Sequence, residues 1–174
     1  DDQADIAAPP WTKLRDLEYA SLQLERDEAE DERDYMKWLK MLIAPGGSLG
    51  GARPKASVLD ENAYPWIAKF PSNKDEINIG RWEFLVHELA QKAGIDTATA
   101  EIKNFSSDYD TFLTRRFDRT EDGERIHFAS AMTLLGKKDG DGADTGVSYL
   151  DLAGFLMKNG AQVNKDLEQL WRRI

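Results

Sequence analysis

The chain of 174 residues contains no cysteine. This absence excludes a disulfide framework, a thiolate nucleophile and a cysteine-ligated metal, and it fits the cytoplasm, where we expect the protein to reside. The sequence also lacks an apolar run long enough to span a membrane. Its acidic start has neither the basic residues nor the apolar centre of a signal peptide, so we expect no association with a membrane.

Basic residues are fewer than acidic ones: the 23 lysines and arginines and the 32 aspartates and glutamates give a net charge of −9. Nucleic-acid phosphates are bound by clustered basic residues, so we expect no direct nucleic-acid binding by this chain. Much of the negative charge lies in "ERDEAEDERD", residues 25–34, which is typical of a solvated helix face. The hydrophobic fraction of 41% and five tryptophans indicate a globular protein with a core.

Hydrophobic spacing divides the chain into three parts. Residues 1–44 are predicted to be a helical segment, because Leu14 and Leu17 recur at helical spacing, as do apolar residues from 35 to 42. Residues 45–132 mix a helix at 78–95 with expected strands at 55–59, 66–70, 99–105, 111–117 and 125–128. Residues 133–174 are predicted to be helical again. The fold class is therefore α+β, with an antiparallel sheet.

In the predicted helix 78–95, five apolar residues fall on one helical face. They are Ile79, Trp82, Leu85, Val86 and Leu89. Gly94 is placed to cap the end of this helix. His87 lies one position away from the apolar stripe, and we interpret it as a packed or surface histidine rather than a ligand.

The stretch "PGGSLGGARPKAS", residues 45–57, is either a flexible linker or a backbone cradle for phosphate. It is followed by a strand, a second strand that carries Lys69, and a helix that carries Glu83 and Glu88. This order is that of the N-terminal lobe of a protein kinase. Glycines let backbone N–H groups approach phosphates, while the lysine pairs with phosphate oxygens and a glutamate holds it. A flexible linker does not need a lysine-bearing strand and a glutamate-bearing helix after it, so we favour the phosphate-binding interpretation.

Five segments give a more specific resemblance: "GGSLGGARPKASV", "WIAKFPS", "WEFLVHELAQKAGI", "LTRRFDR" and "IHFASAMTLLG". In order and spacing, residues 45–174 resemble the HipA-like serine/threonine kinases of bacterial toxin–antitoxin systems. The resemblance implies a kinase-like N-terminal lobe over residues 45–132 and the helical start of a C-terminal lobe over 133–174. It also implies ATP and Mg²⁺ as cofactors, a protein serine or threonine as substrate, and a DNA-binding antitoxin as the partner of the full-length protein.

The same resemblance assigns roles to residues. Lys69 is the phosphate-pairing lysine and Glu83 its partner, so both are expected to serve catalysis. Ser48 is also a regulatory site, because some family members phosphorylate the equivalent loop serine on themselves. Arg53 and Pro54 depart from the Gln-Glu that is commoner in the family. The implied ATP-binding residues are Ser48, Gly50, Gly51, Ala52, Arg53, Lys55, Lys69, Ser130, Ala131 and Met132.

The catalytic aspartate and the Mg²⁺ ligands of the family are expected beyond Ile174. We also expect a preceding β-rich subdomain, of which residues 1–44 would be the helical tail. The chain is therefore expected to be part of a longer kinase and to be inactive alone. The alternative is a non-catalytic protein-binding module that keeps the fold of the lobe, but the presence of both Lys69 and Glu83 favours the kinase.

Two further patterns have a simpler interpretation than a functional one. "DGDGADTG" resembles the start of an EF-hand loop, but Asp144 stands at the sixth position in place of glycine, and Leu150 stands at the twelfth in place of the bidentate acid. We therefore expect a surface loop and no metal site. Arg115, Arg116 and Arg119 are predicted to pair with Asp118 and with the acidic helices, and each pair is expected to contribute little to stability. In the alternative, one of these arginines contacts an acidic partner or substrate.

Overall fold

The computed structural model describes residues 8–26, 42 and 53–174. Contacts between Cα atoms divide the chain into two compact units. The first comprises Asp1–Leu89 with Ala98–Arg125, and the second comprises Ala90–Thr97 with Ile126–Ile174. The domain boundaries expected after residues 44 and 132 stay predictions.

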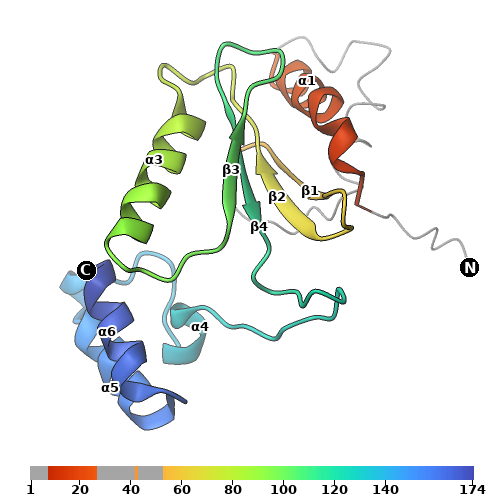
Figure 1. Ribbon diagram of the computed structural model, residues 1–174. Helices are drawn as coiled ribbons and strands as arrows, with labels where there is room; N and C mark the ends of the chain where they lie inside the picture. Colours follow the sequence, from red (N-terminus) through yellow and green to blue (C-terminus); the bar gives the residue numbers. More distant parts are fainter. Residues whose placement is uncertain (1–7, 27–41, 43–52) are drawn as a thin grey trace, which may run out of the picture. The chain divides into compact units, whose positions relative to one another are not determined.

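In the described part of the first unit, four strands form one sheet in the order β1-β2-β4-β3 (Figure 1). All neighbouring strands are antiparallel. The predicted α+β class is confirmed, and the strands expected at 55–59 and 66–70 agree to within one residue. The strands expected at 99–105 and 111–117 are present but shorter. The strands are β1 Lys55–Leu59, β2 Pro65–Lys69, β3 Ala100–Lys103 and β4 Thr111–Arg115.

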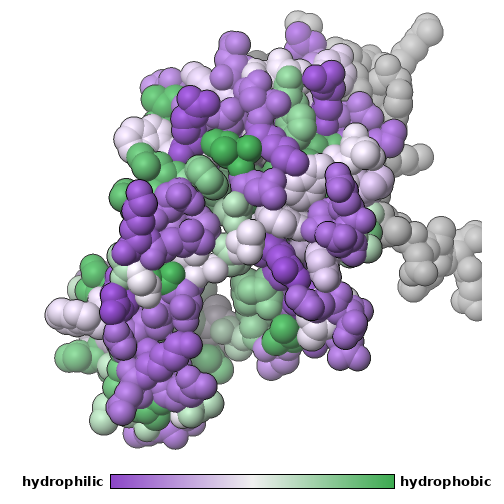
Figure 2. Space-filling model, in the orientation of Figure 1, coloured by the Kyte–Doolittle hydropathy of each residue, from purple (hydrophilic) through white to green (hydrophobic). Residues whose placement is uncertain are grey.

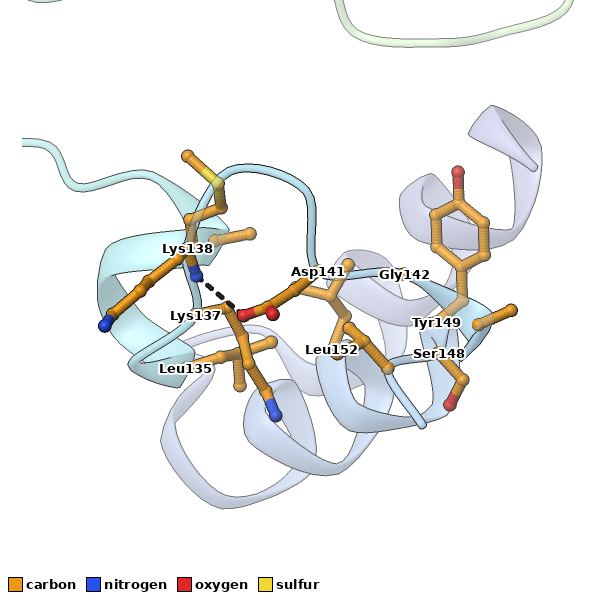
Figure 3. Close-up of a pocket in the computed structure, with 12 residues that line it drawn as sticks. Leu135, Lys137, Lys138, Asp141, Gly142, Ser148, Tyr149 and Leu152 are labelled. Atoms are coloured by element: carbon orange, nitrogen blue, oxygen red, sulfur yellow. Dashed lines mark hydrogen bonds between the residues drawn. The ribbon is translucent and has the colours of Figure 1, made fainter. Parts of the chain in front are cut away.

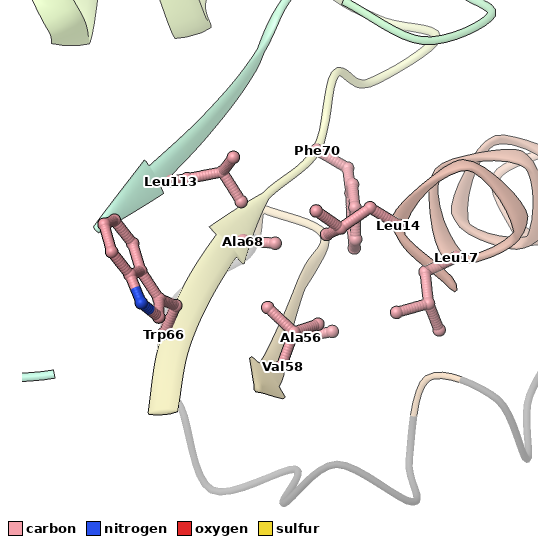
Figure 4. Close-up of a cluster of buried hydrophobic side chains, with 8 residues drawn as sticks. All are labelled: Leu14, Leu17, Ala56, Val58, Trp66, Ala68, Phe70 and Leu113. Atoms are coloured by element: carbon pink, nitrogen blue, oxygen red, sulfur yellow. The ribbon is translucent and has the colours of Figure 1, made fainter. Parts of the chain in front are cut away.

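One face of this sheet packs against α1, Leu14–Leu24, which follows a short 3-10 turn at Trp11–Lys13. Figure 4 shows Leu14 and Leu17 reaching from α1 toward the sheet, as their helical spacing predicts. Period-2 alternation brings the apolar strand residues to this face. The second predicted stripe, at 35–42, lies outside the described residues except for Leu42, which packs against the core. The buried cluster consists of Leu14, Leu17, Ala56, Val58, Trp66, Ala68, Phe70 and Leu113.

The other face of the sheet packs against α3, Ile79–Lys92, and Figure 1 shows the sheet between α1 and α3. The strand register places Lys55, Lys69 and Phe112 in one row across the sheet. Directly paired residues of antiparallel strands point to the same face, so these three side chains share the face that α3 covers. Gly94 has a φ of +73°, consistent with its predicted place after the end of α3.

Gly80 is where α3 approaches the sheet most closely. A Cβ atom built on Gly80 would lie 2.0 Å from the backbone oxygen of Asp110, far inside van der Waals contact. Polar contacts secure the same junction, because Asn78 Nδ2 and Arg81 Nε donate to Asp110 Oδ2 over 2.7 and 2.8 Å. The Asp110 side chain is only 5% exposed. Only glycine fits at position 80 in this packing.

The apolar face predicted for this helix faces solvent and not the sheet. Trp82, Leu85, Val86 and Leu89 are between 45% and 61% exposed, and Figure 2 shows hydrophobic residues at the surface over α3. The sheet is contacted instead through Gly80, Glu83 and His87. His87 Nε2 lies 2.7 Å from the carbonyl oxygen of Ala98, and its ring stacks on Phe84, so its interpretation as a packed histidine is confirmed.

The second unit is helical. It contains α4 Ala131–Leu135, a 3-10 turn at Ala143–Thr145, α5 Tyr149–Asn159 and α6 Val163–Arg173. α5 packs against α4 and α6. The loop after α3 is bonded to α6, because Arg172 Nη1 donates to the carbonyl oxygen of Ala93 over 2.6 Å. The surface loop expected for "DGDGADTG", residues 139–146, is confirmed.

The strand predicted at 125–128 is wrong. Arg125 makes only an isolated bridge to Arg119, and residues 126–130 have no regular structure. Ile126 and Phe128 alternate as in a strand, but they are 44% and 57% exposed. Alternation alone does not make a strand where no neighbouring strand completes the ladder.

No helix in residues 8–26, 42 or 53–174 is both long enough and apolar enough to cross a membrane. Across the same residues, no group of three or more histidines and acids is placed to hold a metal ion.

Gly80→Ala tests the packing of α3 on the sheet. Alanine normally stabilises a helix interior by about 1 kcal/mol relative to glycine. At position 80 we expect the opposite sign, a loss of about 1–3 kcal/mol, because the methyl group collides with the backbone of β4 and the loop before it. Gly154→Ala in α5 is the matched control, since nothing lies within 4 Å of a Cβ there. Hydrogen exchange in increasing urea measures each unit separately, and stabilisation by Gly80→Ala would contradict the packing.

Candidate functional site

Lys69 and Glu83 form an ion pair on the α3 face of the sheet. Lys69 is the last residue of β2, and its Nζ atom donates to Oε1 of Glu83. The same Nζ lies 5.4 Å from the centroid of the Phe112 ring. The two side chains are 31% and 32% exposed, so solvent and a solute can reach them. The structure thus brings together the two residues that the sequence nominates for catalysis.

The fold explains why Glu83, and not Glu88, meets Lys69. Glu83 follows Gly80 by three residues, so it lies on the helix face that touches β4. Lys69 is paired with Phe112 of β4, directly beneath that face. Glu88 is 44% exposed and lies 4.0 Å from His87 Nδ1. Glu83 is therefore the acid that orients Lys69.

A second lysine lies beside this pair. Lys55 begins β1 and is the register partner of Lys69, so the two basic side chains start from adjacent positions on one face of the sheet. Like charges directly opposite each other in a sheet are unfavourable. Glu83 compensates the charge of Lys69 on this face.

The predicted phosphate loop is described only at its end. Ser48, Gly50, Gly51 and Ala52 lie outside the described residues. Arg53 is described, and its guanidinium donates to the carboxylate of Asp75. The contact with Asp75 joins residues 22 positions apart, and no periodicity or motif in the sequence indicates it.

The predicted adenine contacts lie in the second unit. Ser130 caps α4, because its Oγ accepts a hydrogen bond from Thr133 N at 3.1 Å, and Ala131 and Met132 form the first turn of that helix. Ala131 and Met132 also line a hollow of about 580 Å³ (Figure 3). Its rim is held where Lys138 N donates to Asp141 Oδ2 over 2.8 Å. The lining combines the apolar Leu135, Val147 and Leu152 with Tyr149 and with the polar Lys137, Lys138, Asp141 and Ser148. Mostly apolar walls with a few polar groups suit a ligand that has an apolar or aromatic part.

The arginine cluster is anchored on one buried acid. Arg116 holds Asp118 with two bonds, Nε to Oδ1 at 2.8 Å and Nη2 to Oδ2 at 2.7 Å, and Arg119 Nη1 contacts Oδ2 at 2.7 Å. Arg115 lies over the ring of Tyr64 and 3.9 Å from Glu121. The predicted pairing with Asp118 is confirmed for Arg116 and Arg119. Their hydrogen bonds and charges outweigh burial and hold the pKa of Asp118 below its ordinary value of 3.8.

Residues 47–174 match the family model of the HipA-like C-terminal domain. The match covers the described strands and α3 to α6, including Lys69 and Glu83. No curated protein matches the chain.

Asp118 makes stability depend on acidity. Because the pKa of Asp118 is lower in the folded protein, Asp118 is protonated first in the unfolded chain as the pH falls. The stabilising effect of ionised Asp118 is therefore complete above about pH 4, and it is lost as the pH falls through the lower pKa of the folded protein. Asp118→Asn should cost about 2 kcal/mol at neutral pH, because two arginines lose a charged partner. We expect the difference in unfolding free energy between wild type and variant to shrink in acid. Urea unfolding from neutral pH to about pH 2.5 measures it, and a constant difference would show that ionised Asp118 is not the cause.

Proposed function

Because the chain belongs to the HipA-like C-terminal domain family, we propose that it is the ATP-binding part of a HipA-like serine/threonine kinase. In this proposal the full-length protein transfers the γ-phosphate of ATP to a serine or threonine of a protein substrate. It acts as the toxin of a bacterial toxin–antitoxin system, with a DNA-binding antitoxin as its partner. The observation that carries the proposal is the ion pair of Lys69 and Glu83.

The exposure of this pair supports a functional role. An ion pair about two-thirds buried at the edge of a helix contributes at most about 1 kcal/mol to stability. Its contribution to phosphate binding is larger, because a cation held in one orientation meets phosphate oxygens without first being ordered. Lys55, beside Lys69 in the sheet, adds positive charge to the same face.

The residues of this chain have separate tasks in the proposed reaction. Lys69 binds phosphate oxygens, and Glu83 keeps the ammonium group of Lys69 at the end of β2. The glycines of residues 46–51 allow backbone N–H groups to approach phosphate without a Cβ in the way. ATP, when bound, supplies the phosphoryl group that is transferred. Ser130, Ala131 and Met132 are proposed contacts of the adenine ring.

The alternative, a non-catalytic module that binds proteins, does not require the pair. A protein-binding surface gains nothing from a lysine held at the end of a strand by a helix glutamate. The described residues supply that pair, so we favour the kinase.

Substituting the pair in the full-length protein tests the proposal. Lys69→Ala should lower phosphoryl transfer about a hundredfold or more, since a charged contact to the transferred group is lost. Glu83→Ala should act through the same lysine, so the double variant should lose little more than Lys69→Ala alone. Transfer of radiolabelled phosphate from ATP to protein measures activity. The free energy of unfolding, measured in urea, should differ between each variant and wild type by no more than about 1 kcal/mol.

Glu88→Ala is the matched control and should retain wild-type activity, because Glu88 lies beside His87 and not beside Lys69. If Lys69→Ala transfers phosphate as fast as wild type, the proposed function is wrong. If the fold-losses of activity in Lys69→Ala and Glu83→Ala multiply in the double variant, Glu83 does not act through Lys69.

A further inference from the structure

The end of the predicted phosphate loop is tied to the segment between β2 and α3. Arg53 Nη1 donates to Asp75 Oδ1 over 2.8 Å, and Arg53 Nη2 donates to Asp75 Oδ2. Both carboxylate oxygens are thus engaged by one guanidinium group, the geometry in which arginine binds carboxylate most strongly. The Asp75 side chain is 8% exposed and that of Arg53 is 26% exposed. The acid of the pair is therefore nearly buried, while the arginine is partly exposed.

Asp75 is itself held in place by its own turn. Its Oδ2 atom accepts a hydrogen bond from Ser72 N at 2.9 Å, and its backbone N–H donates to the carbonyl oxygen of Ser72 over 3.1 Å. Burial would raise the pKa of Asp75, but the bonds from Arg53 and Ser72 outweigh it and hold that pKa below 3.8. At neutral pH, Asp75 is a fixed anion that receives Arg53.

A backbone bond acts at the same place. Phe70 N donates to the carbonyl oxygen of Pro54 over 3.0 Å, and Phe70 is fully buried in the core. Phe70 directly follows Lys69, so the residues just after the loop are joined to the residues just after the lysine. Arg53 and Pro54 together fix where the loop ends relative to Lys69.

We propose that Asp75 is a positioning residue that holds Arg53, and through it the end of the glycine-rich loop, beside Lys69. Arg53 is then a tether of the loop and not a ligand of phosphate. If Arg53 moved to bind a phosphate, the carboxylate of Asp75 would remain buried without its partner, and this raises the free energy. The role in ATP binding rests on the proposed function, whereas the tether itself rests only on the contacts of Arg53 and Pro54.

ATP titrations of the full-length protein separate a tether from a ligand. If Arg53 is a tether, Asp75→Ala and Arg53→Ala should each weaken ATP binding about tenfold, and the double variant should be no weaker than the weaker single one. Arg53→Lys should also weaken binding, because lysine keeps the charge but cannot bind both carboxylate oxygens in parallel. If Arg53 binds phosphate, Asp75→Ala should leave the affinity unchanged or raise it, which would overturn the proposal.

Asp118→Ala is the control for general loss of stability. It removes another arginine–aspartate pair with two parallel bonds, Arg116–Asp118, and should leave ATP affinity unchanged. A comparable loss of affinity in Asp118→Ala would overturn the proposal, because the effect would then reflect stability alone.

Hydrogen exchange distinguishes the failure of the tether from the failure of the proposed function. The amide of Phe70 should exchange faster in Asp75→Ala and Arg53→Ala than in wild type, since its acceptor on Pro54 is no longer held. Unchanged exchange overturns the tether whatever the ATP titrations give. A wild-type protein that binds no ATP overturns the proposed function and the role of Asp75 in ATP binding, while faster exchange still supports the tether.

Discussion

The packing of α3 against β4 at Gly80 determines the geometry of the candidate site. With no Cβ at this position, the helix backbone can approach the backbone of Asp110, and Glu83 lies one turn further along the same face. Asp110 secures the approach through Asn78 and Arg81. Because this junction is backbone against backbone, it leaves little freedom for the helix to shift. The contact between Glu83 and Lys69 follows from it.

The segment that joins β2 to α3 organises two basic side chains, Arg53 and Lys69. It supplies Asp75, which holds Arg53, and it leads into the helix that supplies Glu83, which holds Lys69. In each case a carboxylate fixes a basic side chain in one position. The two basic side chains are similarly exposed, at 26% for Arg53 and 31% for Lys69, but Asp75 is only 8% exposed whereas Glu83 is 32% exposed. Loss of Arg53 would leave a buried acid unpaired, so we assign the tethering role to the arginine and phosphate binding to the lysine.

Sequence patterns predicted the parts of the fold that depend on local periodicity. The spacing of Leu14 and Leu17 identified the helix that covers the core. The order of strands and helix nominated Lys69 with Glu83 or Glu88, and the resemblance to the HipA-like kinases singled out Glu83. The patterns failed where the outcome depends on tertiary contacts. The apolar stripe of α3 suggested a packing face, but the close approach at Gly80 turned a different face to the sheet. Asp75 could not be found, because its partner lies 22 residues away.

The most direct test of this account is a crystal structure of the full-length protein with a non-hydrolysable ATP analogue. The account predicts that Lys69 Nζ contacts phosphate oxygens of the analogue while Glu83 still holds that ammonium group, and that Arg53 remains bound to Asp75. A structure in which the phosphates lie away from Lys69 would contradict the central claim. Phosphates bound by Arg53 with Asp75 left unpaired would contradict the division of roles between the two basic residues.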